Sequence, residues 1–169
     1  MSGYNREQIE AMLAKYGDMV YRMAIIQVKK QDLAEDIYQT VWLRLLQQKK
    51  TIEPEEHLKA WLLRTTINCC KDYWKSAWIQ RICSRDTERM EERIEETPEA
   101  EGAGGFLTEC VQGLPEKYRT IIHLYYYEDY KCKEIAKILG ISENTVISRL
   151  ARGREKLKKL LEEEEKYEF

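Results

Sequence analysis

The chain has 169 residues, with 28 lysines and arginines against 30 aspartates and glutamates and a net charge of −2. This length suits one domain or two small ones. Hydrophobic residues make up 43% and charged residues 34%, so a core can form and disorder throughout the chain is excluded. No apolar run reaches the ~18–20 residues of a membrane span, and the first residues do not lead into a signal peptide. We therefore expect a cytoplasmic protein.

The motifs of common enzyme and metal sites are missing from the sequence. The five cysteines form no C-x-x-C pair, and neither His57 nor His123 lies in a metal-binding motif. The nucleophile elbow and the glycine-rich phosphate loops are also missing. We predict no enzyme activity, no metal, no cofactor and no small-molecule substrate. A metal-dependent or thiol enzyme is an alternative, but it has few candidate ligands. These are Cys69 and Cys70, or His57 with nearby glutamates.

Apolar residues recur three or four positions apart over most of the chain, which predicts an all-α fold. Residues 4–30 are expected to form one helix or a pair, with Gly17 at a possible break. Residues 32–48 form a clearer helix, capped by Asp32. Four of its apolar residues share one stripe and are expected in the core: Leu33, Ile37, Val41 and Leu45.

Pro54 interrupts this pattern, and helical spacing resumes near Glu55. Residues 81–110 are poor in apolar residues and contain Pro98 and three glycines, which predicts a flexible linker. The chain is thus expected to form two small helical domains. The expected boundaries are a first domain at 1–80, the linker at 81–110, a second domain at 111–161 and an acidic tail at 162–169.

Residues 133–150 have the pattern of a helix-turn-helix. Gly140 can take the left-handed conformation that ends a helix, and Ser142 can cap the next one. Ala136 is small where two helices must cross closely, and Val146 and Leu150 supply apolar contacts between them. The second helix would then present five residues near its N-terminal half to the bases of a major groove: Asn144, Thr145, Ser148, Arg149 and Arg152.

The charge distribution supports DNA binding by this segment. Residues 143–159 hold six basic and two acidic residues, a local charge of +4, whereas glutamates gather in residues 162–169. A basic stretch of this kind supplies contacts to phosphates. Ile147 either contacts a thymine methyl group or packs inward, and packing is slightly favoured.

The first half of the chain carries a second pattern, and with the helix-turn-helix it resembles the extracytoplasmic-function (ECF) sigma factors of bacteria. Residues 34–45 are similar to the family's D-x-x-Q helix, through Asp36 and Gln39. The resemblance covers residues 16–161. It implies an alternative sigma factor that directs RNA polymerase core to a class of promoters, and it implies that Asp36, Gln39 and Leu43 bind the clamp helices of the core.

Residues 59–73 resemble the family segment that binds the minus-10 element as single-stranded DNA. The implied contacts come from Arg64, Asn68, Lys71 and Lys75, of which Asn68 is the best match. The preceding stretch, residues 48–57, is implied to capture an extruded base. Trp61 is expected in the core, whereas Trp74 and Trp78 either pack or contact DNA.

Residues 113–119 resemble the opening of sigma region 4, so the helix-turn-helix is implied to read the minus-35 element. The implied partners are the clamp helices and flap of RNA polymerase core, promoter DNA and an anti-sigma factor. Lys131 departs from the family because a capping serine or threonine is common there, and Asp129 is the available substitute.

A helix-turn-helix transcription regulator that binds DNA as a dimer, outside the polymerase, is the alternative function. It would account for residues 113–159. It leaves the helix that carries Asp36 and Gln39 unexplained.

Overall fold

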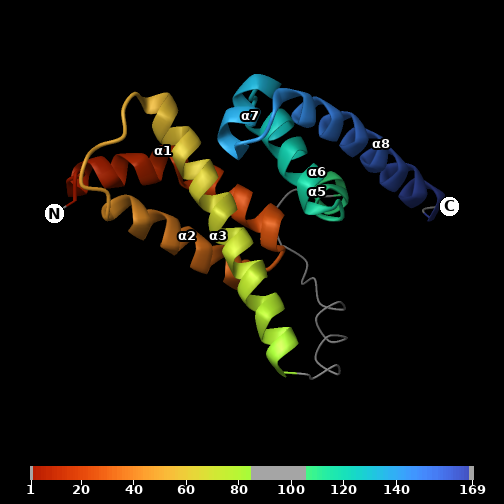
Figure 1. Ribbon diagram of the computed structural model, residues 1–169, viewed down its shortest axis with the longest axis horizontal. Coiled ribbons are helices and arrows are strands. Elements are labelled where there is room, and N and C mark those ends of the chain that lie inside the picture. Colours follow the sequence, from red (N-terminus) through yellow and green to blue (C-terminus); the bar gives the residue numbers. More distant parts are fainter. Residues whose placement is uncertain (1, 85–105, 168–169) are drawn as a thin grey trace. The chain divides into compact units, whose positions relative to one another are not determined.

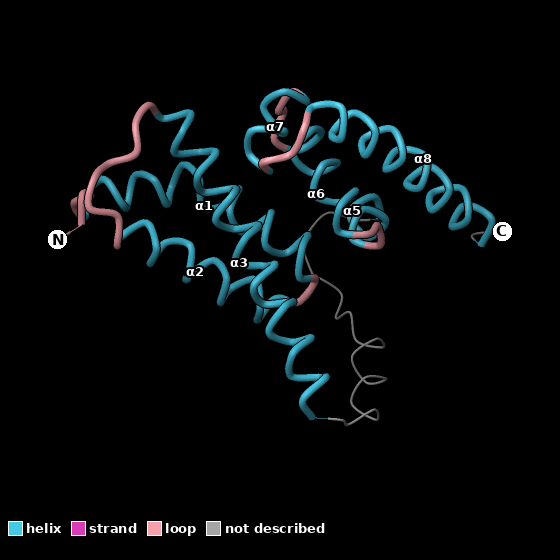
Figure 2. The backbone as a smooth tube through the Cα atoms, in the orientation of Figure 1, coloured by secondary structure: helices cyan, strands magenta, loops and turns pink. Residues whose placement is uncertain are grey.

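The computed structural model describes residues 2–84 and 106–167, which form helices joined by short loops (Figure 1, Figure 2). The chain divides into two compact units, residues 1–101 and residues 102–169. The prediction of an all-α fold with two helical domains is confirmed. No helix among the described residues is both long enough and apolar enough to cross a membrane.

Among its described residues, the first unit contains three helices: α1 (Arg6–Val28), α2 (Gln31–Leu46) and α3 (Glu55–Ser84). The possible break at Gly17 is wrong, because α1 runs through this position without interruption. A Cβ atom on Gly17 would lie 3.0 Å from the Tyr38 hydroxyl oxygen. Gly17 therefore lets α1 and α2 approach closely.

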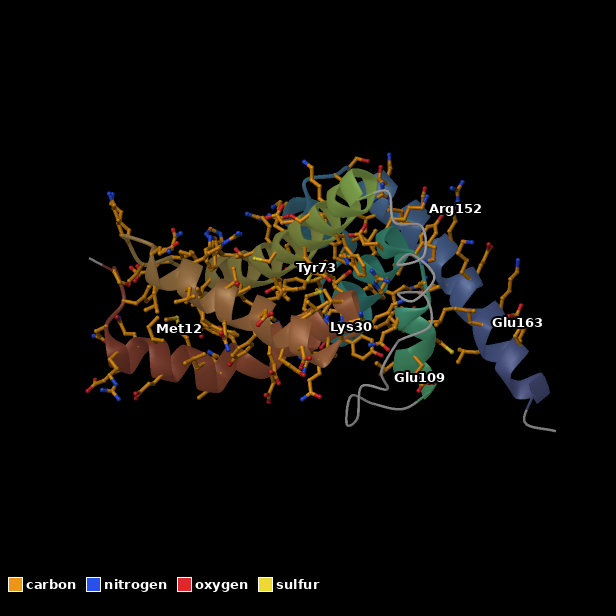
Figure 3. The ribbon with its side chains drawn as sticks, turned by 90° about the horizontal axis from the view of Figure 1, so that it is seen from below. Met12, Lys30, Tyr73, Glu109, Arg152 and Glu163 are labelled. Atoms are coloured by element: carbon orange, nitrogen blue, oxygen red, sulfur yellow. The ribbon has the colours of Figure 1, made fainter. Side chains whose placement is uncertain are left out.

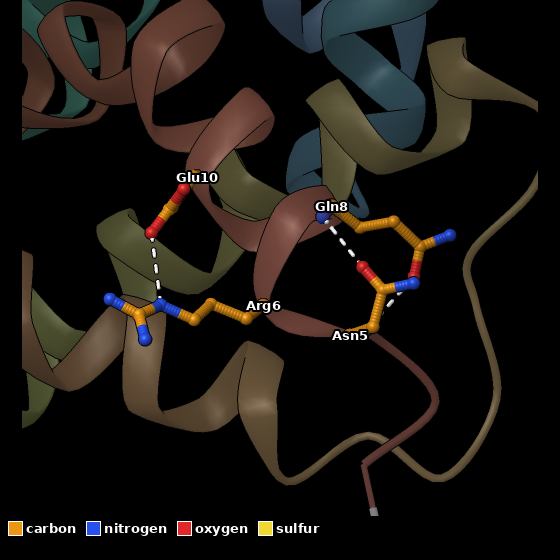
Figure 4. Close-up of polar contacts among 4 residues, drawn as sticks. All are labelled: Asn5, Arg6, Gln8 and Glu10. Carbon is orange, nitrogen blue, oxygen red and sulfur yellow. Dashed lines mark hydrogen bonds and ion pairs between the residues drawn. The ribbon is translucent and has the colours of Figure 1, made fainter.

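The start of α1 is fixed by a reciprocal cap at Asn5 (Figure 4). The Gln8 backbone N–H donates to Asn5 Oδ1 at 2.8 Å, and the Asn5 backbone N–H donates to Gln8 Oε1 at 2.9 Å. Two N–H groups without partners inside the helix are satisfied in this way. At the start of the helix, the Arg6 side chain pairs with Glu10 on the exposed surface, with 3.1 Å between Arg6 Nε and Glu10 Oε1.

The start of α2 differs from the prediction. Lys30 holds the N-cap position without a side-chain cap, and Asp32 lies in the first turn of the helix. The negative charge of Asp32 still suits the positive end of the helix dipole. The predicted core stripe is confirmed at Ile37, Val41 and Leu45, whereas Leu33, in the first turn of α2, is half-buried.

A loop over residues 47–54, with a cis peptide bond before Pro54, leads into α3. α3 buries Leu58, Leu62 and Ile67 against α1 and α2. It continues through residues 81–84, which the sequence pattern assigned to the linker. Figure 1 shows its C-terminal part, drawn in green, extending past the other two helices.

The second unit contains four α-helices and one π-helical turn among its described residues: α5 (Phe106–Gln112), α6 (Glu116–Ile122), η1 (His123–Tyr127), α7 (Cys132–Leu139) and α8 (Glu143–Tyr167). α5 begins inside the segment expected to be linker, and α8 includes most of the expected tail. The remaining part of the expected linker, residues 85–105, lies outside the described residues.

Two close contacts organise the second unit. A Cβ atom on Gly153 would lie 3.2 Å from Ile122 Cγ1 and 3.3 Å from Tyr118 Cβ, so this glycine allows α8 to cross α6 closely. Arg119 is buried and donates to the carbonyl oxygens of Gln112 and Leu114, at 3.3 and 3.1 Å. These bonds hold the connection between α5 and α6.

A buried pair follows in the π-helical turn. His123 Nε2 lies 3.3 Å from Glu128 Oε1, and both side chains are almost completely shielded from solvent. The His123 ring also stacks on Tyr127, with 5.2 Å between ring centroids. This pair fixes the chain just before the helix-turn-helix.

Candidate functional site

One face of α2 carries the residues that the sequence assigned to polymerase binding. Asp36, Gln39 and Leu43 are all exposed, and 57% of Leu43 is open to solvent. Their spacing of three and four places them on one side of the helix, away from the buried stripe. Leu46, at 38% exposure, extends the same side. We refer to Asp36, Gln39, Leu43 and Leu46 as the α2 row.

The sequence analysis missed Leu46. Its position three residues after Leu43 was the available indication, because side chains three apart lie on the same side of a helix. Two exposed leucines on one helix face leave apolar area open to a partner.

The four residues assigned to the minus-10 element form a second row, on α3. Arg64, Asn68, Lys71 and Lys75 are all exposed. With spacings of four, three and four, they lie within roughly 60° of one another around the helix axis. We refer to them as the α3 row. Three positive charges and one amide on a single line can contact a strand through both its phosphates and its base edges.

The aromatic residues of α3 take different positions. Trp74 is 38% exposed next to the α3 row, and its ring contacts Tyr73 edge-on with 5.5 Å between centroids. Trp61, expected in the core, is only half-buried. Figure 3 labels Tyr73 on this helix. The Trp78 side chain lies outside the described residues.

Hydrogen bonds connect the loop before α3, and the first residue of α3, to the N-terminal residues and α1. The Gly3 backbone N–H donates to the Gln48 carbonyl at 2.7 Å, and the Ile52 backbone N–H donates to the Tyr4 hydroxyl at 2.6 Å. At the end of the loop, the Tyr16 hydroxyl donates to Glu55 Oε1 at 2.7 Å. Lys15 also pairs with Glu55, and this bond and the Tyr16 bond lower the pKa of the Glu55 carboxyl.

The helix-turn-helix of the second unit has the predicted geometry. Gly140 ends α7 with φ at +68°, and the Ile141 N–H bonds the Ala136 carbonyl at 3.1 Å. Ser142 caps α8, because its Oγ accepts the Thr145 N–H at 3.1 Å. Val146 and Leu150 are buried as expected.

The inward stripe of α7 is Ile135, Ala136 and Ile138, whereas Leu139 is half-buried. The start of α7 differs from the sequence analysis, which offered Asp129 as the substitute cap. The side chain of Glu134 accepts the Lys131 backbone N–H at 3.0 Å. This bond satisfies the Lys131 N–H and is the half of a capping box that the side chain at the third helical position supplies.

The outer side of α8 presents most of the residues assigned to the minus-35 element. Asn144, Ser148 and Arg152 are exposed, and Arg149 is half-buried. Thr145 is also half-buried, and its hydroxyl lies 2.7 Å from Ser142 Oγ, so it belongs to the cap. Figure 3 labels Arg152 on this helix.

Ile147 does not pack inward. Half of this residue is exposed, so the favoured interpretation from sequence is wrong. The buried side of α8 is already occupied at Val146 and Leu150. Ile147 and the exposed Ala151 lie one turn apart and form a small apolar area beside Asn144 and Ser148.

Two of the basic residues of α8 contact tyrosine side chains. Arg154 Nε donates to the Tyr126 hydroxyl at 2.5 Å, and its guanidinium lies 5.3 Å from the Tyr125 ring centroid. Lys156 lies 5.8 Å from the Tyr118 ring centroid. These cation–π contacts join α8 to the segment before α7. The sequence contained no periodic pattern that pairs these residues.

The described residues contain no group of three or more histidines, cysteines, aspartates or glutamates placed to hold a metal ion. Three exposed surfaces are present on the described residues: a mixed polar and apolar row on α2, a basic and amide row on α3, and a helix-turn-helix face on α8. These surfaces suit binding of macromolecules.

Comparison with known proteins assigns both units. The family described as "Sigma-70 region 2" matches residues 12–79, and "Sigma-70, region 4" matches residues 107–157. A helix-turn-helix regulator outside the polymerase does not account for the first match. Both units therefore have counterparts in one family.

Whole-chain relatives agree with this assignment. The chain is 32% identical over 138 residues to the RNA polymerase sigma factor SigV of Bacillus subtilis, covering 79% of this chain and 78% of the relative. It is 27% identical to the ECF RNA polymerase sigma factor SigM of the same species, covering 90% and 94%.

A similar fold occurs in a solved structure of the sigma factor RpoE of Bartonella quintana in complex with the anti-sigma factor NepR. The TM-score is 0.69 at 21% identity, covering 90% of this chain and 96% of that one. From these sequence matches, the chain belongs to the sigma-70 family and is an RNA polymerase sigma factor of the ECF group.

Proposed function

We propose that this sigma factor directs RNA polymerase core to a class of promoters through three surfaces: the α2 row, the α3 row with residues 48–57, and the outer side of α8. The observation that carries the proposal is that one chain combines region 2 and region 4 and leaves these rows open to solvent. The protein performs no covalent chemistry in this role and acts by binding.

The α2 row is proposed to bind the clamp helices of the polymerase core. Asp36 and Gln39 offer polar contacts, and Leu43 offers apolar area that loses contact with water when a partner helix packs on it. Central apolar contacts surrounded by polar ones are typical of protein interfaces. The second unit is proposed to bind the flap of the same core.

The α3 row and the preceding loop are proposed to hold the minus-10 element as a single strand. Arg64, Lys71 and Lys75 supply charge for the phosphates, and Asn68 supplies donors and an acceptor for a base edge. Trp74, partly exposed beside them, offers a face on which a base can stack. Preference for unpaired bases would stabilise melted promoter DNA.

The outer side of α8 is proposed to read the minus-35 element in the major groove. Arg149 and Arg152 can contact guanine or phosphate, and Asn144 can contact adenine. Because both DNA elements are read within one polymerase complex, the second contact becomes intramolecular and gains effective concentration. Neither surface alone needs high affinity.

The proposed partners and setting follow from this role. RNA polymerase core and promoter DNA lie in the cytoplasm of bacteria, which is where the protein is proposed to act. An anti-sigma factor that covers these surfaces is a further proposed partner, by analogy with the RpoE–NepR complex.

The first prediction concerns the α2 row. Asp36→Ala is expected to weaken binding to polymerase core about tenfold, because it removes a charged contact of the proposed interface. Glu35→Ala is the matched control, since it removes an exposed carboxylate one position away. The measurement is titration of labelled sigma factor with purified core. Equal losses for the two variants would contradict the assigned row.

The second prediction concerns Asn68. Asn68→Ala is expected to weaken binding of the holoenzyme to a single-stranded minus-10 oligonucleotide about fivefold, the effect of about one hydrogen bond. Ser76→Ala is the control, because Ser76 is an exposed residue on the same helix. Fluorescence anisotropy measures both, and an unchanged affinity of the Asn68 variant would remove this residue from the site.

The third prediction concerns Arg152. Arg152→Ala is expected to lower affinity for minus-35 duplex by about five- to a hundredfold while binding to core persists, because one arginine contact to DNA is removed. Lys158→Ala, about 9 Å further along α8, should retain most of the affinity. Transcription at the wild-type level by the Arg152 variant would contradict the assignment of the recognition helix.

The fourth prediction concerns Ile147, which we propose reads a thymine methyl group. Replacing one minus-35 thymine by deoxyuridine should weaken the wild-type holoenzyme about fourfold, because one buried methyl group is lost. The Ile147→Ala holoenzyme should bind the two DNAs equally, whereas Ile147→Val should still discriminate. If no thymine position matters to the wild type, Ile147 does not make this contact.

A further inference from the structure

Residues 2–5 lie against the loop that joins α2 to α3. Two hydrogen bonds connect them: the Gly3 N–H donates to the Gln48 carbonyl at 2.7 Å, and the Ile52 N–H donates to the Tyr4 hydroxyl at 2.6 Å. Gly3 and Tyr4 are both half-buried. These two bonds are four positions apart in the loop, so they hold residues 48–52 at both ends.

The approach at Gly3 is too close for any other residue. A Cβ atom there would lie 2.7 Å from the Lys50 carbonyl carbon and 2.9 Å from the Lys49 carbonyl oxygen. Both are backbone atoms, which cannot move aside as a flexible side chain can. A larger residue would therefore push residues 2–4 and the loop apart.

The direction of this segment is set by α1. The reciprocal cap between Asn5 and Gln8 fixes the residue that precedes the helix (Figure 4). The Tyr4 backbone N–H also donates to Ser2 Oγ at 3.1 Å. Residues 3 and 4 thus leave a fixed helix end and reach the loop without slack.

The loop itself has little burial to hold it. Lys49, Lys50, Thr51 and Glu53 are exposed, and Gln48 and Ile52 are half-buried. A loop that is mobile in the free protein loses backbone entropy when it binds a strand. Contacts that order it beforehand reduce that loss and raise affinity.

We propose that Gly3 and Tyr4 are positioning residues that hold loop 48–54 ready to bind the single-stranded minus-10 element. This inference rests on the proposed function of the loop and names residues outside it that control its shape. The two lysines at its tip, Lys49 and Lys50, are then presented to the phosphates of the strand.

The test compares four holoenzymes, assembled from polymerase core and full-length wild-type, Tyr4→Phe, Gly3→Ala or Glu10→Ala protein. Tyr4→Phe keeps the ring and removes the hydroxyl that accepts the Ile52 N–H. Its affinity for a single-stranded minus-10 oligonucleotide should fall about two- to tenfold, the effect of one hydrogen bond. Gly3→Ala should fall at least as far, and Glu10→Ala, on the exposed surface of α1, is the control.

Three further readouts separate positioning from general damage. Affinity for core and for minus-35 duplex should stay within twofold of wild type for every variant. Hydrogen exchange of the free protein should become faster over residues 48–54 and remain unchanged in α1 and α2. A uniform loss of core, minus-35 and minus-10 binding would overturn the positioning role, because it would indicate unfolding.

The remaining outcomes distinguish the inference from the function on which it rests. Equal minus-10 affinities for wild type, Tyr4→Phe and Gly3→Ala, with the wild type still preferring the minus-10 strand to a scrambled one, would overturn the inference alone. A wild-type holoenzyme that does not distinguish the two strands would overturn the proposed role of the loop, and the inference with it.

Discussion

The helices that carry the candidate site residues, α2, α3 and α8, bury one side and expose the other, and this constraint decides where the functional residues lie. In α2 the core takes Ile37, Val41 and Leu45, which leaves the α2 row in solvent. In α8 the core takes Val146 and Leu150, which leaves Arg152 outside. A helical period of 3.6 residues thus separates residues that stabilise the fold from residues that can bind partners.

Helical periodicity is also why much of the fold was predictable from the sequence. The Ile37 stripe, the turn at Gly140 and the cap at Ser142 are local patterns, and each appears in the structure. The exposure of most candidate site residues followed from the same period, whereas Thr145 and Arg149 are half-buried. Their roles came from family resemblance, because exposure alone does not say what a surface binds.

The features that the sequence did not predict depend on contacts between distant residues. The contact of Arg154 with Tyr126 joins positions 28 apart, and that of Tyr4 with Ile52 joins positions 48 apart.

Ile147 was misjudged because its apolar character suggested burial, whereas the inward positions of α8 were already filled by its neighbours. Asp32 does not cap α2 because the N-cap position is taken by Lys30, two residues earlier.

The central claim is that the exposed rows act together on polymerase and promoter DNA, and transcription in vitro from genomic DNA tests it most directly. Purified core with this protein should initiate at discrete start sites that share two upstream sequence elements at a fixed spacing. Core alone should not use these sites. Initiation that does not depend on the protein, or start sites without shared elements, would contradict the account.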